Sequence, residues 1–244
     1  MGMKAASELY VKIFADGADL KGISNLSRNP VIKGFTTNPT LMRKAGIQDY
    51  RGFAREVLGI IGERPVSFEV FSDDFAEMEK QAMEIASWGP NVYVKIPVTN
   101  TRREFAGELI RSLARTGVQL NITALLTNEQ VRAVLECLSP QTRSCVSVFA
   151  GRVADTGRDP VPLMAEAVQL LKANSKAELI WASPRELLNI FHADAVGCHI
   201  ITVTHDILNK LPLVGKDLAE YSLDTVKMFY QDARSAGFQI ETTR

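Results

Sequence analysis

Short apolar runs rich in β-branched residues recur along the chain, and each is followed by a stretch with helical spacing. Eight such runs occur, at residues 10–16, 34–38, 66–71, 92–98, 119–125, 145–151, 177–183 and 199–205. The intervening stretches place apolar residues three and four positions apart, and several carry a glycine near their end. Eight strands alternating with helices predict an α/β fold, a single-domain (β/α)8 TIM barrel over residues 1–244.

A doubly wound parallel sheet is the competing fold, because it also alternates strands with helices. Its glycine-rich GxGxxG turn is missing after the first run, residues 10–16. No linker, low-complexity segment or change in composition divides the chain. These observations favour the barrel.

Composition restricts the class of partner. Lys plus Arg and Asp plus Glu both number 28, so a net charge of zero gives no indication of nucleic-acid or membrane-surface binding. No apolar run reaches the roughly 18 residues that span a bilayer. Cys137, Cys145 and Cys198 form no CxxC pair and lack metal-ligand spacing, and the chain has no secretory signal. We expect a soluble, cytoplasmic protein with reduced cysteines and no metal site.

Strand periodicity predicts which side chains face the barrel interior, since alternate residues point to opposite faces. Lys95 lies between Val94 and Ile96 and therefore points to the other face from these two. The same alternation places more polar groups on the interior face, near the carboxyl ends of their strands: Asp16, Glu69, Asn121, Thr123 and Ser147. Barrel enzymes hold their active sites at that end.

Lys95 is the cation of this interior set. An ammonium removed from water costs several kcal/mol unless it is paired or gives up its proton, and a neutral amine is a nucleophile. With Asp16 and Glu69 nearby, Lys95 is suited to Schiff-base chemistry, in which the amine attacks a ketone and the iminium accepts electrons during C–C cleavage. This chemistry needs no cofactor. At least one carboxylate should stand off the amine, because a touching carboxylate would stabilise the charged form.

Five stretches together resemble the transaldolase family, including its short branch that contains the fructose-6-phosphate aldolases. They are GFTTNPTLM (34–42), VYVKIPVT (92–99), NITALLT (121–127), VSVFAGRV (146–153) and WASPREL (181–187). The resemblance implies a (β/α)8 barrel with a Schiff base on Lys95. It also implies that Asp16 is the acid and base at the cleaved carbinol, and that Glu69 moves protons through a water held by Thr123.

The resemblance further implies a set of substrate-binding residues: Thr37, Asn38, Asn121, Ser147, Phe149, Arg152, Ser183 and Arg185. Within this set, Asn38, Asn121 and Ser147 would bind the dihydroxyacetone portion of a sugar, and the last three residues would hold its phosphate. Arg152 and Arg185 follow neighbouring strands, so their guanidinium groups could both reach one phosphate.

Two positions separate activities within the family. The transaldolase branch resembles this sequence in having Glu69 and Phe149, whereas the aldolase branch has Gln and Tyr there. A tyrosine hydroxyl could protonate the enamine and release dihydroxyacetone, but a phenylalanine cannot. The resemblance therefore implies a transferase of the pentose phosphate pathway that moves dihydroxyacetone between sugar phosphates. The alternatives are an aldolase acting on fructose 6-phosphate or another anionic ketose, such as a sulfonated one, and a non-catalytic barrel retained for binding or assembly.

Three positions depart from the family pattern. Gly17 stands where a small hydroxyl residue is expected after Asp16, Pro184 replaces an aromatic residue, and His205 replaces an apolar one. These departures bear on which substrate is used.

The C-terminal stretch 216–237 has the spacing of an amphipathic helix, with Leu218, Tyr221, Val226 and Phe229 available for burial. In the short branch of the family this segment embraces a neighbouring subunit. The resemblance therefore implies a homo-oligomer.

Overall fold

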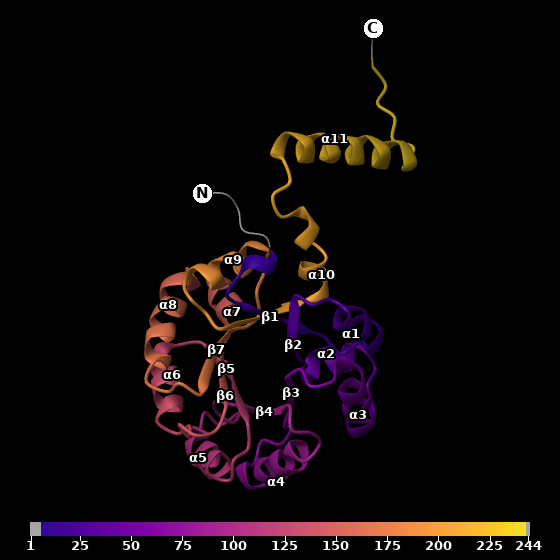
Figure 1. Cartoon of the computed structure of the whole chain (residues 1–244). Coiled ribbons are helices and arrows are strands. Elements are labelled where there is room, and N and C mark those ends of the chain that lie inside the picture. Colours follow the sequence, from indigo (N-terminus) through magenta and orange to yellow (C-terminus); the bar gives the residue numbers. More distant parts are fainter. Residues whose placement is uncertain (1–5, 243–244) are drawn as a thin grey trace.

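A closed barrel of eight parallel strands forms the centre of the computed structural model, which describes residues 6–242 (Figure 1). The strands are β1 (Lys12–Asp16), β2 (Ile32–Thr36), β3 (Val66–Glu69), β4 (Val92–Pro97), β5 (Leu120–Leu125), β6 (Ser144–Val148), β7 (Ala177–Trp181) and β8 (Ile200–Thr204). They pair in chain order, and β8 pairs with β1. The predicted (β/α)8 TIM barrel is therefore confirmed, and closure excludes the doubly wound sheet. Of the range 1–244 expected as one domain, residues 1–5 and 243–244 lie outside the described residues.

Helices alternate with the strands along the chain, and most of them surround the barrel, whereas the last one projects away from it. They are α1 (Leu20–Ser27), α2 (Pro39–Lys44), α3 (Tyr50–Ile61), α4 (Phe75–Ala86), α5 (Gly107–Arg115), α6 (Asn128–Leu135), α7 (Ala150–Ala154), α8 (Pro160–Leu171), α9 (Leu188–Ala195), α10 (His205–Leu208) and α11 (Leu218–Ser235), with short 3-10 turns η1 (Ala6–Glu8) and η2 (Leu211–Leu213). Side chains such as Asp49, Asp74 and Thr127 cap helices by accepting a hydrogen bond from a free backbone N–H of the first turn. Among the described residues, no helix has the length and apolar character that crossing a bilayer requires.

Several element boundaries differ by a few residues from the sequence expectation, and two of the differences have an identifiable local cause. The second strand was expected over 34–38 but spans Ile32–Thr36, because Asn38 already caps α2 by accepting from the N–H of Leu41 at 3.0 Å. The stretch with helical spacing after the fourth strand, residues 103–117, becomes a helix only from Gly107, because the preceding loop folds back through a bridge between Thr99 and Phe105. Both differences are local, and the alternation of inward and outward side chains within the strands is as predicted.

The outward faces of the strands pack against the helices and form the main hydrophobic core. Val94 and Ile96 belong to this core and are fully buried. A second, smaller apolar cluster fills the barrel interior and consists of Phe14, Tyr93, Cys145, Ile180, Ala182 and Ile200, with Phe149 packed against it. The interior cluster forms a floor beneath Lys95 and the other polar residues at the carboxyl ends of the strands.

Gly34 makes room for this floor. A Cβ atom at Gly34 would lie 2.5 Å from Cζ of Phe14, so the absent side chain lets the Phe14 ring lie directly against β2. Below the floor, Lys12 and Glu178 form an ion pair with a distance of 2.5 Å between Nζ and Oε1. The barrel interior thus changes from charged to apolar to polar along its axis, in layers that are typical of this fold.

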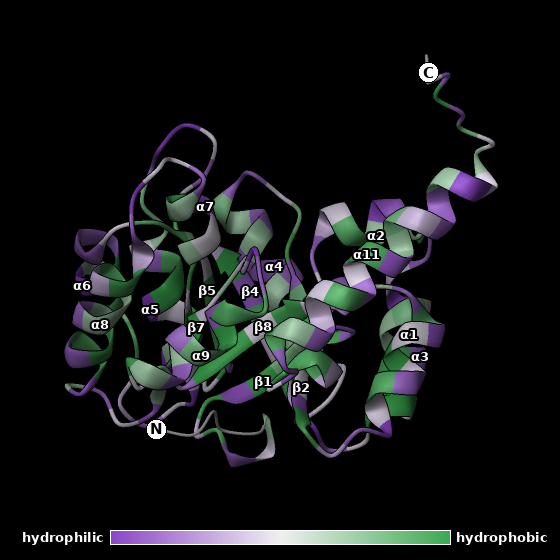
Figure 2. Ribbon diagram, turned by 90° about the horizontal axis from the view of Figure 1, so that it is seen from above, coloured by the Kyte–Doolittle hydropathy of each residue, from purple (hydrophilic) through white to green (hydrophobic). Residues whose placement is uncertain are grey.

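The helix predicted over 216–237 is present as α11, which begins after the N-cap Asp217 and projects away from the barrel in both ribbon views (Figures 1 and 2). It carries no buried residue, although it is rich in large apolar side chains. Leu218 is 81% exposed and Phe229 is 63% exposed. This helix therefore leaves an apolar surface without a partner within the described chain.

Candidate active site

Lys95 lies in the middle of β4 with its side chain inside the barrel, and it is buried. Parallel pairing places Glu69 of β3 and Asn121 of β5 directly beside it in the same register row. Thr123 lies on β5 opposite Pro97, one inward position nearer the carboxyl end, and is also buried. The structure thus brings together the predicted lysine, its neighbouring carboxylate and the predicted water-holding threonine.

The Nζ atom of Lys95 donates a hydrogen bond to the backbone carbonyl of Thr37 at 2.7 Å. This carbonyl is free because the ladder of hydrogen bonds between β2 and β3 ends here. The N–H of Thr37 still donates to the carbonyl of Ser67 at 3.2 Å, but the next hydrogen bond of the ladder does not form. In a regular parallel ladder that rung would join the N–H of Glu69 to the carbonyl of Thr37. The interrupted rung gives the amine an acceptor that carries no charge.

On the β3 side, the hydroxyl of Tyr50 from α3 replaces the missing hydrogen-bond partner of the Glu69 backbone. Its hydroxyl accepts from the N–H of Glu69 at 2.7 Å and donates to the carbonyl of Glu69 at 3.0 Å. The ring packs edge-on against Phe68 and Trp88. Burial raises the pKa of Tyr50 well above its ordinary value, so this hydroxyl stays protonated. Tyr50 therefore fixes the backbone from which Glu69 enters the site.

Both predicted carboxylates stand off the amine, since no carboxylate oxygen of the described residues lies within 4.0 Å of Lys95 Nζ. Burial raises the pKa of Asp16 and of Glu69, and the charge of Lys95 opposes the rise in each case. Asp16 also raises the pKa of Glu69 slightly, because two nearby like charges disfavour each other. These carboxyl groups are therefore able to exchange protons at a higher pH than exposed ones.

Asp16 ends β1 and is held by a hydroxyl pair at the top of the barrel. Thr36 Oγ1 donates to Asp16 Oδ1 at 2.7 Å, and it also makes a short contact with the hydroxyl of Thr202. The strand register pairs Asp16 with Thr36 and with Thr204. One carboxylate oxygen is thereby fixed while the other has no hydrogen bond within the described chain.

The residues predicted to bind the dihydroxyacetone portion occupy two adjoining regions. Asn121 donates to Ser67 Oγ at 2.9 Å and accepts from Ser147 Oγ at 2.7 Å, and all three side chains are buried. Thr37 uses its hydroxyl to bind the carbonyl of Ser67 at 3.2 Å, and Asn38 uses Oδ1 as the cap of α2. Of Thr37 and Asn38, it is Asn38 that keeps a polar group for a ligand, namely its side-chain amide nitrogen.

The predicted phosphate-binding residues come together at the ends of β6 and β7. A Cβ atom at Gly151 would lie only 1.5 Å from the carbonyl oxygen of Ser183, so a glycine is needed for the two loops to approach this closely. Ser183 has a positive φ of 60°, which is rare for a residue with a side chain. Arg152 lies over the ring of Phe149, with 5.6 Å from Cζ to the ring centroid.

Arg185 forms an ion pair with Asp155. Its Nε donates to Asp155 Oδ1 at 2.8 Å, and its second fork nitrogen contacts Asp155 Oδ2. The pKa of Asp155 is lowered by this hydrogen bond, and the nearby charge of Arg152 adds to the effect. Two cations and one anion thus line the predicted phosphate region.

Sequence reasoning missed four residues of this site: Tyr50, Thr36, Ser67 and Asp155. Each of the four contacts a site residue that is distant in sequence, and none is of a residue type that by itself indicates a site. The signal that could have found Ser67 is strand parity, because Ser67 lies two residues before Glu69 on the same strand and therefore shares its inward face.

Two of the departures from the family pattern fit each other. A Cβ atom at Gly17 would lie 2.9 Å from Nε2 of His205, and one at Gly22 would lie 2.3 Å from its Cε1. The imidazole thus fills the space that the two glycines leave between β1 and α1. A side chain at position 17 would therefore require the imidazole of His205 to shift.

Comparison with known proteins identifies relatives over most of the chain. The family model described as Transaldolase/Fructose-6-phosphate aldolase matches residues 13–242. A probable transaldolase of Dehalococcoides mccartyi is 36% identical over 218 residues, which cover 88% of this chain and 97% of the relative. A probable transaldolase of Methanococcus maripaludis is 31% identical over 218 residues, with the same coverage of 88% and 97%.

Solved structures are similar at the level of the fold. A putative copper homeostasis protein CutC from Streptococcus agalactiae aligns with a TM-score of 0.59 and 11% identity, covering 79% of this chain and 97% of that protein. A 3-hexulose-6-phosphate synthase from Salmonella typhimurium aligns with a TM-score of 0.56 and 14% identity, covering 82% and 91%. Identities this low show the barrel alone. The family match over residues 13–242 carries the assignment, and the chain belongs to the transaldolase/fructose-6-phosphate aldolase family.

Proposed function

We propose that this protein is a transaldolase that moves a dihydroxyacetone unit from a ketose phosphate to an aldose phosphate through a Schiff base on Lys95. The observation that carries the proposal is the environment of the amine. Nζ is buried, donates to the uncharged carbonyl of Thr37 at 2.7 Å, and has no carboxylate of the described residues within 4.0 Å. An amine that is hydrogen-bonded to an uncharged carbonyl can turn to a substrate ketone without first breaking an ion pair.

The first half of the reaction joins substrate and enzyme. The amine attacks C2 of the ketose, and the resulting carbinolamine loses its hydroxyl as water to give the iminium. Glu69 supplies and removes the protons of this step through a water held by Thr123. This role fits a buried carboxyl group whose pKa is raised, in the strand next to that of Lys95.

Cleavage uses the second carboxylate. Asp16 removes the proton from the C4 hydroxyl, the C3–C4 bond breaks, and its electron pair moves to C3 and the iminium to give an enamine. C4 leaves as the aldehyde carbon of an aldose phosphate. In the second half the enamine attacks the aldehyde of the acceptor, and Asp16 returns the proton. Hydrolysis of the new iminium then releases the product and restores Lys95.

Binding groups surround these reacting atoms. Asn121 and Ser147 face the dihydroxyacetone portion together with Asn38, whereas Arg152, Ser183 and Arg185 hold the phosphate. Phe149 has no hydroxyl to protonate the enamine, so the intermediate persists until an aldehyde arrives. This last feature favours transfer over the release of free dihydroxyacetone.

A trapping experiment tests the covalent step. Borohydride added in the presence of fructose 6-phosphate should reduce the iminium and attach a three-carbon or six-carbon fragment to the peptide that contains Lys95, as read by mass spectrometry. Lys95→Met keeps most of the apolar volume and should abolish labelling while circular dichroism shows a folded barrel. Labelling of another lysine would remove Lys95 from the mechanism.

A product experiment separates transferase from aldolase. Fructose 6-phosphate alone should give little free dihydroxyacetone, and turnover should begin when erythrose 4-phosphate is added. Equal release with and without the acceptor would assign the protein to the aldolase reaction. Repeating the assay with a sulfonated ketose tests whether another anion serves better than phosphate.

A further inference from the structure

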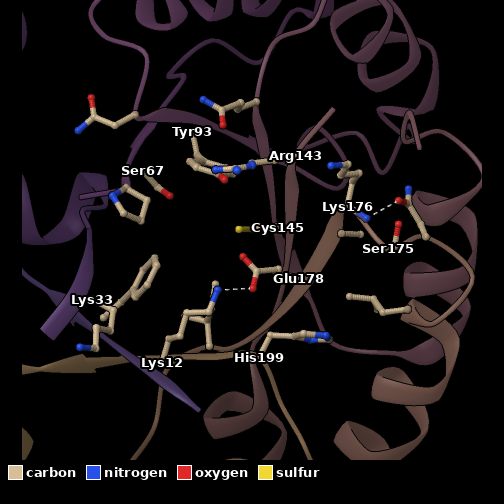
Figure 3. Close-up of a pocket in the computed structure, with 18 of the residues that line it drawn as sticks. Lys12, Lys33, Ser67, Tyr93, Arg143, Cys145, Ser175, Lys176, Glu178 and His199 are labelled. Carbon is tan, nitrogen blue, oxygen red and sulfur yellow. Dashed lines mark hydrogen bonds and ion pairs between the residues drawn. The ribbon is translucent and has the colours of Figure 1, made fainter. Parts of the chain in front are cut away.

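A cavity of about 1330 Å3 opens at the amino-terminal mouth of the barrel, at the opposite end from the site around Lys95 (Figure 3). Its lining includes Lys12, which starts β1, Arg143 and Lys176, which precede β6 and β7, and His199, which precedes β8. Cavities that hold small-molecule ligands typically measure about 300 to 1,000 Å3, so this one is large enough for a metabolite.

The lining carries an excess of positive charge although the whole chain is neutral. It contains five cationic side chains, Lys12, Lys33, Arg143, Lys172 and Lys176, and two acidic ones, Glu63 and Glu178. Lys12 neutralises Glu178 through the ion pair of 2.5 Å, which Figure 3 shows near the centre of the cavity. No acidic oxygen of the described residues lies within 4.0 Å of Arg143, Lys172 or Lys176. These three cations are available to an anion.

Neutral donors complete the wall. Arg143 and Tyr93 both line the cavity, and burial raises the pKa of Tyr93 to about 12, so the phenol keeps its proton. His199 accepts the N–H of Leu179 on Nδ1 at 3.1 Å, which places the proton of a neutral imidazole on Nε2. Burial also lowers the pKa of His199 and favours that neutral form.

The cavity is separated from the catalytic end by the apolar floor of Phe14, Ile180 and Ile200. A ligand in the cavity would therefore not reach Lys95. Ser67 contacts both ends of the barrel interior. It lines the cavity, and its hydroxyl accepts a hydrogen bond from Asn121 of the candidate active site. The cavity lining combines apolar side chains, among them Phe14 and Ile200, with the cations.

We propose that the amino-terminal mouth of the barrel is a second binding site, for a phosphorylated small molecule. Arg143 and Lys176 hold the phosphate, since a guanidinium forms paired hydrogen bonds to phosphate oxygens and an ammonium adds a point charge. The remainder of the ligand lies over Phe14 and Ile200. This site does not depend on the proposed reaction, because none of its residues takes part in it.

Isothermal titration of the full chain with inorganic pyrophosphate tests the proposal. The wild type should bind at two sites per chain, one at each end of the barrel. Arg143→Gln combined with Lys176→Gln should weaken one site at least tenfold and leave the other unchanged. Arg152→Gln should give the reverse pattern. Lys21→Gln, an exposed cation on α1, is the matched control and should change neither.

Histidine NMR locates the ligand independently. The chain has three histidines, so the imidazole resonances of His199 and His205 can be assigned by substitution. Pyrophosphate should shift the His199 signals in the wild type and in Arg152→Gln, but not in the variant without Arg143 and Lys176. An unperturbed His199, or a single binding site that Arg152→Gln abolishes, would overturn the proposal.

Discussion

The hydroxyl of Tyr50 binds both backbone polar groups of Glu69, accepting from its N–H at 2.7 Å and donating to its carbonyl at 3.0 Å. It replaces a rung of the β2–β3 ladder, and the carbonyl that this rung would have used instead accepts the amine of Lys95. A single interruption in the sheet thus shapes the surroundings of both residues.

Tyr50→Phe should therefore disturb the site without disturbing the ring packing. The Glu69 N–H loses its acceptor in a buried region, which should lower the free energy of unfolding by about 1 to 3 kcal/mol. We expect kcat to fall more than KM rises, because the role that we propose for Glu69 is proton transfer and not sugar binding. Urea denaturation and steady-state kinetics measure these effects. Tyr230→Phe on exposed α11 is the control, and an equal loss in both variants would contradict the prediction.

Asp16 should make stability depend on pH in a defined direction. Burial raises the pKa of Asp16 in the folded protein, so the folded state binds the proton more tightly than the unfolded state. Ionisation of Asp16 then lowers the free energy of unfolding as the pH rises from the pKa of the unfolded state toward the higher pKa of the folded state. Asp16→Asn should be more stable than the wild type at pH 7, and the difference should disappear toward pH 4, roughly the unfolded value.

The same substitution should lower kcat by about 10² to 10⁴, because it removes the carboxylate that we propose as the general base of C–C cleavage. Thermal melts across this pH range, compared with kcat at pH 7, check both statements. A variant that is less stable than the wild type at neutral pH would contradict the assigned direction.

Gly151→Ala should destabilise the protein and weaken phosphate binding. The new methyl group would lie 1.5 Å from the carbonyl oxygen of Ser183, so the loop that carries Arg185 must move. We expect a loss of about 1 to 3 kcal/mol and a higher KM for phosphorylated substrates. Gly59→Ala in α3 is the matched control: no atom lies within 4 Å of its Cβ position, and it should stabilise by about 0.4 to 1 kcal/mol. Similar behaviour of the two variants would contradict the close approach.

Phe149→Tyr should shift the reaction from transfer toward cleavage. The added hydroxyl extends from the rim of the interior cluster and, if it reaches the Schiff-base water, it provides a general acid worth roughly 10² in rate. Release of dihydroxyacetone from fructose 6-phosphate should rise and transfer to erythrose 4-phosphate should fall. A coupled assay of both products measures the ratio of released dihydroxyacetone to transfer product. An unchanged ratio in a folded variant would show that the hydroxyl does not reach the intermediate.

The exposed face of α11 should be covered by another copy of the chain. Leu218, Val226 and Phe229 are exposed, and apolar surface of this extent favours association. Light scattering at micromolar concentration should report a homo-oligomer. Val226→Glu combined with Phe229→Glu should reduce its mass to that of a smaller species, whereas Gln231→Glu should not. A monomeric wild type would refute the assembly.

The periodicity of the strands could be read from the sequence because it depends on local alternation. Lys95 among apolar neighbours, and Asp16 and Glu69 at strand ends, were predicted to face inward for this reason, and the structure places them there. The eight-fold alternation with helices likewise predicted the barrel, and the missing GxGxxG turn favoured it over an open doubly wound sheet. The second strand was expected over 34–38 and ends earlier, at Thr36, because Asn38 already caps α2.

The tertiary structure alone decided which polar groups meet. Tyr50 reaches Glu69 across 19 residues of sequence, and Arg185 forms its ion pair with Asp155 across 30. No local pattern encodes such contacts, because they depend on where a ladder stops and how two loops approach. The sequence by itself determined which faces of the strands are polar, through the two-residue repeat of a strand. The folded barrel decided their partners, through the register between strands that are distant in the chain.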